Sequence, residues 1–134
     1  MIIGVDFGRK RIGLAVLHDD GLVLPLTTIT QHSRRASLEA VARQMTEAGC
    51  RQVICGLPLN MDGTAGPSAR AVERFAAELQ LITGVTVALH DERLSSFEAR
   101  ARMQELSRGK RRKTPDDAVA ACIILESWLQ QHPR

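Results

Sequence analysis

The chain has 134 residues and a mass of 14.7 kDa, a length that suits one compact domain, and we expect residues 1–134 to form a single domain. With 44% hydrophobic and 25% charged residues, the composition is that of an ordinary globular protein and excludes a disordered or fibrous one. The net charge of +3 is small, so the placement of the charges carries more information than their sum.

The first part of the chain predicts three short strands. Apolar runs at 2–6, 12–17 and 22–26 are separated by glycine-containing turns. Pro25 in the third run indicates an edge strand, because proline cannot donate a ladder hydrogen bond. We therefore expect an antiparallel meander.

Helices and strands alternate over the middle of the chain. Apolar residues at three- and four-residue steps predict a helix that ends at Gly49 and a second helix that ends near Gly84. Buried strands are expected at 52–56 and 85–89.

The last part of the chain predicts two more helices. Ser95 with Glu98 forms a capping box for a helix that runs to about Leu106. Thr114 and Pro115 are expected to begin the final helix. A meander followed by βαβ crossovers predicts an α/β fold with a mixed sheet whose faces are covered by helices.

Composition also restricts location and binding mode. Cys50, Cys55 and Cys122 form no CxxC pair and lie among apolar neighbours, which predicts buried thiols in a reducing compartment. Without a signal sequence or an apolar run near the ~18 residues of a membrane span, we expect a soluble cytoplasmic protein that binds no membrane. Aromatic residues make up only 3%, which disfavours binding of single strands by stacking of bases on aromatic side chains.

Acidic residues stand where three predicted elements begin or end. Asp6 ends the first strand, Asp91 and Glu92 follow the fifth strand, and Asp116 and Asp117 open the last helix. Carboxylates that converge from separate elements are suited to Mg²⁺ or Mn²⁺, and such ions activate water in phosphodiester cleavage.

Each of these groups also has a structural interpretation. Asp6 could form a turn, and the acids of the last helix could interact with the helix dipole. The segment 91–93 could form a surface ion-pair patch. His90 could shuttle protons or be structural, and the scattered histidines do not have zinc-ligand spacing.

Basic residues adjoin the candidate metal ligands. One basic run follows Asp6 and the other precedes Asp116, which favours an anionic polymer crossing the site over two solvated loops. The loop after the fourth strand has no P-loop pattern, and it could either contact phosphate or be purely structural. The candidate nucleic-acid-binding residues are Arg9, Lys10, Arg11, Asn60, Arg93, Lys110, Arg111, Arg112 and Lys113.

Four segments, in order along the chain, resemble the motifs of one protein family. They are GVDFG at 4–8, GLPLNMDGT at 56–64, HDERLSSFEA at 90–99 and the helical segment 117–127. Together they resemble the YqgF/RuvX family of bacterial pre-16S rRNA nucleases, which are also called Holliday junction resolvases. The resemblance covers essentially the whole chain.

The resemblance implies an RNase H-like fold: a five-stranded mixed sheet in the order 3-2-1-4-5, with strand 2 antiparallel and helices on both faces. It also implies a divalent-metal endonuclease in which Asp6, Glu92 and Asp117 are the catalytic and metal-binding acids. Two alternatives stay open, namely Asp116 in place of Asp117 and Asp62 in place of Glu92.

The leading hypothesis is a metal-dependent endonuclease that processes the 5′ end of precursor 16S rRNA, with ribosomal particles as partners and a monomer or weak homodimer as its state. A Holliday junction resolvase acting on DNA is the alternative nuclease. A non-catalytic module that binds RNA or a ribosome-assembly partner is the alternative outside the enzymes. The first hairpin also resembles sugar-kinase and actin-type ATPases, but those close two lobes and this chain has residues for one.

Overall fold

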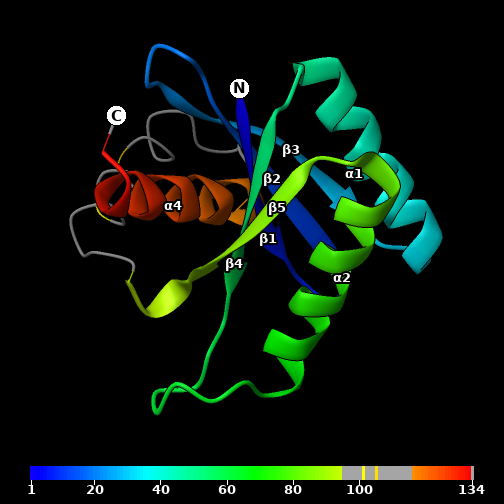
Figure 1. The fold of residues 1–134 in the computed structure, drawn as a ribbon, viewed down its shortest axis with the longest axis vertical. Helices are drawn as coiled ribbons and strands as arrows, with labels where there is room; N and C mark the ends of the chain where they lie inside the picture. Colours follow the sequence, from blue (N-terminus) through cyan, green and yellow to red (C-terminus); the bar gives the residue numbers. More distant parts are fainter. Residues whose placement is uncertain (95–100, 102–104, 106–115, 134) are drawn as a thin grey trace.

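The computed structural model describes residues 1–94, 101, 105 and 116–133 (Figure 1). The predicted capping box of Ser95 and Glu98 and the predicted helix start at Thr114 lie outside these residues. So do four of the candidate nucleic-acid-binding residues, which are Lys110, Arg111, Arg112 and Lys113.

A five-stranded sheet forms the centre of the fold, in the strand order β3-β2-β1-β4-β5. β1 pairs antiparallel with β2 and parallel with β4, and β5 extends the parallel part, so the expected order and the antiparallel second strand are confirmed. The strands are β1 (Ile2–Phe7), β2 (Arg11–Leu17), β3 (Val23–Thr30), β4 (Gln52–Leu57) and β5 (Thr86–Asp91).

Two strands extend at least two residues past the end that the sequence predicted. β3 continues past residue 26 to Thr30, because the β-branched residues at 27–30 suit an extended edge strand. Pro25 pairs with Ala15 next to a register shift in the β2–β3 ladder, a place where a proline is tolerated. β5 continues to Asp91, so His90 and Asp91 belong to the strand rather than to the loop after it.

Capping residues set the ends of the helices. α1 (Arg34–Ala48) begins at Ser33, whose hydroxyl accepts from the amide of Ala36 at 3.1 Å, and ends at the left-handed Gly49 (φ 63°). α2 (Pro67–Thr83) begins with proline and ends at the left-handed Gly84. α4 is described from Asp116 to Gln131.

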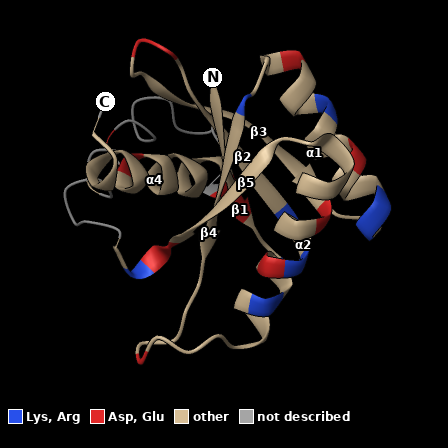
Figure 2. Cartoon of the chain, in the orientation of Figure 1, with Lys and Arg blue, Asp and Glu red and all other residues tan. Residues whose placement is uncertain are grey.

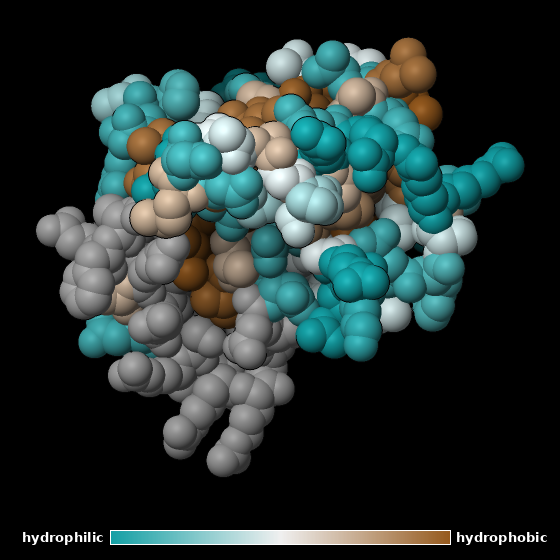
Figure 3. Space-filling view, turned by 90° about the horizontal axis from the view of Figure 1, so that it is seen from below, coloured by the Kyte–Doolittle hydropathy of each residue, from teal (hydrophilic) through white to brown (hydrophobic). Residues whose placement is uncertain are grey.

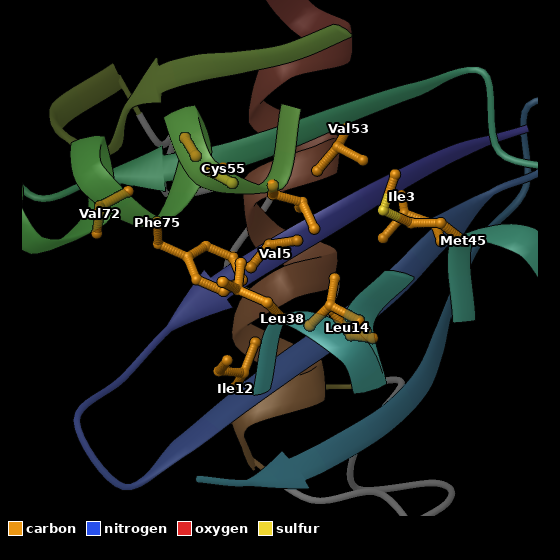
Figure 4. Packing of buried hydrophobic residues seen from close by; sticks show 13 residues of the cluster. Ile3, Val5, Ile12, Leu14, Leu38, Met45, Val53, Cys55, Val72 and Phe75 are labelled. Atoms are coloured by element: carbon orange, nitrogen blue, oxygen red, sulfur yellow. The ribbon is translucent and has the colours of Figure 1, made fainter. Parts of the chain in front are cut away.

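The helices cover both faces of the sheet, as expected. Figure 1 shows α1 and α2 on one side and α4 on the other. On the first side, side chains such as Val5, Leu38 and Phe75 form one apolar cluster (Figure 4). On the second side, Ala15, Ile54 and Leu125 belong to another cluster. Because neighbouring strand residues point to opposite faces, β1 contributes to both clusters.

The cysteines are free thiols and largely match the prediction. Cys55 and Cys122 are buried, and burial raises the pKa of the Cys55 thiol to about 12. Cys50 is only half-buried, because it lies in the turn between α1 and β4. Among the described residues, none of the helices has the length and apolar character needed to span a membrane.

Candidate functional site

Three glycines bring α4 close to the sheet near the ends of β1 and β4. A Cβ on Gly4 would lie 2.5 Å from the Leu125 side chain, and a Cβ on Gly13 would lie 1.9 Å from the backbone oxygen of Asp117. A Cβ on Gly56 would lie 2.5 Å from Ile124. The contact at Gly13 is with the backbone of α4, so a side chain there would push the start of the helix away from the sheet. The contacts at Gly4 and Gly56 are mainly with the Leu125 and Ile124 side chains farther along the helix.

Asp6 lies on this same face, two positions beyond Gly4 on β1, and pairs in register with Gly13 of β2. Since Gly13 lies directly under the backbone of Asp117, the two aspartates meet across one helix–sheet contact. Burial raises the pKa of the Asp6 carboxyl, and the nearby carboxylate of Asp117 raises it further. The strand end and the helix start therefore place two negative charges together.

Arg11 already neutralises part of this charge. Its Nε atom donates to Oδ2 of Asp117 at 2.8 Å, across 106 residues of sequence. Arg11 is the first residue of β2, so the hairpin after Asp6 returns a cation to the carboxylates. Arg11 was predicted to contact nucleic acid, and that role stays a prediction, but the structure gives its guanidinium an acidic partner.

Glu92 folds back over the sheet from the edge strand. It is the first residue of the short helix η1 (Glu92–Leu94), directly after β5. Its carboxyl carbon lies 3.1 Å from the position that a Cβ of Gly56 would occupy. The register pairs Gly4 with Ile54 and Val5 with Cys55, so Gly56 lies beside Asp6 at the next step along β1. Glu92 thus reaches the strand that neighbours β1.

Asp62 occupies a different place. It is exposed in the loop between β4 and α2, where Oδ1 accepts from the amide and the hydroxyl of Thr64 at 3.0 and 2.6 Å. These hydrogen bonds lower the pKa of the Asp62 carboxyl, with a smaller contribution from Arg93. Asp62 shapes the turn, whereas Glu92 lies over Gly56 at the sheet.

Arg93 ties this loop to the end of β5. Its Nε donates to both carboxylate oxygens of Asp91 at 3.1 Å, its Nη2 to Oδ2 at 2.8 Å, and its Nη1 to the carbonyl of Met61 at 3.2 Å. These bonds lower the pKa of Asp91. The ion-pair interpretation of segment 91–93 is confirmed for Asp91 and Arg93, which leaves Glu92 as the acid of this segment that faces the sheet.

The remaining candidate contacts to nucleic acid are divided between the loops. Asn60 donates to the hydroxyl of Thr64 at 3.0 Å and so stabilises its own loop. Arg9 and Lys10 are exposed at the tip of the β1–β2 hairpin. Of the neighbouring acids in α4, the Asp117 side chain is described and faces Asp6, whereas Asp116 is described only as the first residue of the helix.

His90 is buried on the α4 face of β5, where Nε2 lies 2.8 Å from the hydroxyl of Ser127. Burial lowers the pKa of the imidazole, and His132 adds to this effect. The arrangement matches the structural interpretation of His90, as a link between β5 and α4.

The donor chemistry of the site fits a hard divalent cation. Asp6 and Asp117 supply carboxylate oxygens whose mutual repulsion a cation would relieve, and Glu92 of η1 supplies a third carboxylate that lies over Gly56 of the neighbouring strand β4. Within residues 1–94, 101, 105 and 116–133, no three Asp, Glu, His or Cys side chains are close enough together to hold a metal ion. The three-acid site therefore stays a prediction, which requires Glu92 to approach the pair.

Sequence reasoning missed the glycine contacts and the role of Ser127. The signal for the glycines was present, because Gly4, Gly13 and Gly56 each stand between larger apolar residues of a strand. Nothing in the sequence indicated that α4 would pass over all three, or that Ser127 would face His90.

Comparison with known proteins gives one consistent result. A family model described as "RuvX: Holliday junction resolvase" matches residues 1–131. A protein from Anaeromyxobacter sp. (strain Fw109-5), named "Putative pre-16S rRNA nuclease", is 46% identical over 130 residues, which cover 95% of this chain and 94% of the relative. A protein of the same name from Pseudomonas savastanoi pv. phaseolicola is 36% identical over 136 residues, which cover 99% and 93%.

The fold is similar to that of solved resolvases. Thermus thermophilus RuvC in complex with a Holliday junction superposes with a TM-score of 0.68 at 14% identity, with 98% of this chain and 96% of that chain covered. The fowlpox virus resolvase in complex with Holliday junction DNA superposes with a TM-score of 0.60 at 14% identity, with 99% of each chain covered. At this identity the similarity concerns the fold, and it confirms the expected RNase H-like architecture.

Proposed function

The chain belongs to the RuvX family of Holliday junction resolvases, and from this premise we propose that it is a divalent-metal-dependent endonuclease that processes the 5′ end of precursor 16S rRNA. Residues 1–134 would act as one nuclease domain in the cytoplasm. Asp6, Glu92 and Asp117 are the proposed catalytic acids and metal ligands, with Mg²⁺ or Mn²⁺ as the ion.

The observation that carries the proposal is the meeting of Asp6 and Asp117, which are 111 positions apart in the sequence. A half-buried carboxyl facing a second carboxylate is unfavourable for stability, and such arrangements concentrate at functional sites. The backbone contact of Gly13 with Asp117 holds the start of α4 in the position that creates this pair. A fold that needed only a covered sheet would not require the repulsion.

Each residue of the proposed site has its own role. Asp6 is held rigidly inside the sheet, Asp117 is positioned by the contact of α4 with Gly13, and Glu92 is aimed over Gly56 by the turn after β5. Arg11 pairs with Asp117, and if Asp117 held a metal ion the Arg11 guanidinium would be released to pair with a phosphate of the substrate. A bound divalent ion would activate the attacking water and stabilise the leaving oxygen.

The proposed substrate rests on the names of the relatives reported above. Those relatives are named as pre-16S rRNA nucleases, at 46% and 36% identity over nearly the whole chain. A second candidate substrate is the four-way DNA junction, because the family description and the resolvase folds both point to it. Ribosomal particles are the proposed partners for the first substrate and branched DNA for the second.

The test is cleavage by the purified protein of precursor 16S rRNA and of a four-way DNA junction, each with Mg²⁺, with Mn²⁺ and with a chelator. We expect cuts in the 5′ leader of the rRNA that disappear with the chelator and in the Asp6→Asn variant. An Arg51→Ala variant serves as the control, since Arg51 is exposed at the start of β4, away from the carboxylates. Cleavage by Asp6→Asn, or cleavage that a chelator leaves unchanged, would contradict the mechanism.

A further inference from the structure

A second concave site lies on the other face of the sheet. A cavity of about 390 Å³ opens between the β1–β2 hairpin, the start of α1 and the first half of α2. Its volume is in the range of pockets that take small organic ligands, about 300–1,000 Å³. The residues that matter for the argument are three arginines, Arg9, Arg34 and Arg74, and two phenylalanines, Phe7 and Phe75.

The apolar part of the cavity is rigid. Phe75 is only 4% exposed and packs on the side of α2 that faces the sheet, where Figure 4 shows it near Val5 and Leu38. Phe7 is the last residue of β1, and its ring lies 4.6 Å from that of Phe75, centre to centre, tilted by 36°. Phe75 therefore supports the half-buried ring of Phe7, which offers a preformed apolar surface for a flat ligand group.

The polar part of the cavity is strongly basic. None of the described residues that line it is acidic, whereas three arginines and His32 line it. Arg34 is ion-paired with Glu78 of α2, but Arg9 and Arg74 make no hydrogen bond or ion pair with any residue that the structure describes. Guanidinium groups gathered without a carboxylate repel one another, and a bound anion removes that repulsion.

The hairpin that carries Arg9 is fixed to the helix that carries Arg34. The side-chain amide of Gln31 donates to the carbonyl of Gly8, and its oxygen accepts from the buried hydroxyl of Ser37 at 3.0 Å. The backbone amide of Gln31 donates to the carbonyl of Lys10 at 2.8 Å. The arginines are therefore presented from a braced frame, which lowers the entropic cost of ligand binding.

The position of the cavity relates it to the carboxylates. Asp6 and Phe7 are neighbours on β1, and their side chains point to opposite faces of the sheet. The β1–β2 hairpin connects the two places, because Arg9 follows Asp6 by three positions and lines the cavity. Figure 2 shows basic segments on α1 and α2, and α4 carries no Lys or Arg between residues 116 and 131. Figure 3 views the molecule from this end, where hydrophilic residues cover much of the described surface.

We propose that this arginine pocket binds one nucleotide of the substrate strand, with its phosphate on Arg9 and Arg74 and its base or sugar against Phe7. The proposal rests on the proposed nuclease function and adds to it a subsite away from the carboxylates. Arginine pairs with phosphate in a bidentate manner, and aromatic rings accept bases of any sequence. The subsite therefore fixes the path of the strand and does not read its sequence.

The experiment measures binding without cleavage. A fluorescent single-stranded RNA 12-mer is titrated with the protein in EDTA by fluorescence anisotropy, over 50–200 mM KCl, for wild type and for the Arg74→Ala, Arg9→Ala and Arg51→Ala variants. Arg74→Ala and Arg9→Ala should each weaken binding about tenfold, the size expected for a lost charged hydrogen bond. Each should also reduce the slope of log affinity against log salt by about 1. Arg51→Ala should bind like wild type.

Two further outcomes decide the matter. Equal affinities for Arg74→Ala and Arg51→Ala, with melting temperatures unchanged, would overturn the proposal. Adenosine monophosphate, inorganic phosphate and unlabelled 12-mer are compared as competitors of the labelled RNA. If adenosine monophosphate or phosphate competes at concentrations as low as the unlabelled 12-mer does, the pocket binds a free nucleotide or a free phosphate, and the assignment to a nucleic-acid strand is overturned. An inactive protein would refute the proposed nuclease function but leave this test readable, since neither cleavage nor a metal enters it.

Discussion

The substitution Gly13→Ala tests how closely α4 must approach the sheet. The added Cβ would lie 1.9 Å from the backbone oxygen and 2.2 Å from the backbone carbon of Asp117. Ordinary van der Waals contact begins at 3.4 Å, so the oxygen and the new carbon must separate by about 1.5 Å, the difference between 3.4 and 1.9 Å. The oxygen is a backbone atom of Asp117 and the added Cβ is bonded directly to the backbone of residue 13. Rotation of a side chain therefore cannot relieve the clash.

The expected cost follows from the packing of α4. Overpacking a well-packed core costs about 1–3 kcal/mol, and a clash between two backbones lies at the upper end. We therefore expect a loss of about 3 kcal/mol and, at roughly 3 °C per kcal/mol for a chain of this size, a fall of about 10 °C in the melting temperature. Displacement of Asp117 from Asp6 should also lower the nuclease rate by about 100-fold.

A matched control separates the clash from the effect of replacing a glycine. Gly49 ends α1 in the left-handed region (φ 63°), and a Cβ there meets nothing within 4 Å. Gly49→Ala should cost only the backbone strain, about 1–2 kcal/mol, and leave the activity unchanged. Thermal unfolding and nuclease assays on both variants are the measurement. A Gly13→Ala protein as stable and as active as Gly49→Ala would refute the placement of α4 over Gly13.

Three further predictions concern the charges and the buried pair near the site. Asp6→Asn should raise the melting temperature at neutral pH while abolishing cleavage. Burial and Asp117 raise the pKa of Asp6 in the folded state, so the wild-type protein loses stability as pH rises through that pKa, and the stability gain of the variant should shrink as pH falls toward 3.8. A variant without a gain in thermal unfolding at any pH would mean that Asp6 is solvated. Arg11→Ala should cost less than about 1 kcal/mol in chelator, because the Arg11 side chain is 58% exposed. Mn²⁺ should stabilise this variant more than wild type in a calorimetric scan, and equal stabilisation would mean that Arg11 and the cation do not compete for Asp117. Ser127→Ala should lower the free energy of unfolding in urea by about 1–3 kcal/mol, because it leaves the buried His90 nitrogen unpaired. Since burial lowers the pKa of His90, wild-type stability should decline as pH falls below 6.5, and His90→Gln should remove this decline.

Much of the fold could be predicted because local signals were strong. Gly49 and Gly84 end their helices in the left-handed conformation expected of them, and Pro25 lies on an edge strand as predicted. The strand order 3-2-1-4-5 came from the family resemblance and not from periodicity. The lengths of β3 and β5 were underestimated, because an edge strand needs no continuous apolar run and its polar end resembles a loop.

The site could be predicted less well, because contacts between distant segments leave no local trace. Asp6 and Asp117 could be named from their positions and from the resemblance, but their closeness depends on Gly13, whose contact with α4 is a tertiary feature. The sequence also gave no indication that Arg11 pairs with Asp117, or that Arg34 and Arg74 of two different helices line one cavity with Arg9. Basic runs were visible along the chain, whereas a basic pocket assembled from three elements was not.

The claim that the carboxylates share a divalent cation is tested most directly by crystals of the protein grown with Mn²⁺ and a non-cleavable nucleic-acid strand. An anomalous difference map at the manganese edge should show a peak about 2.1–2.3 Å from carboxylate oxygens of both Asp6 and Asp117, with Glu92 joining them and Arg11 released to the phosphate. A map with no peak at these residues, in which Asp117 keeps its bond to Arg11 while the strand is bound, would contradict the account.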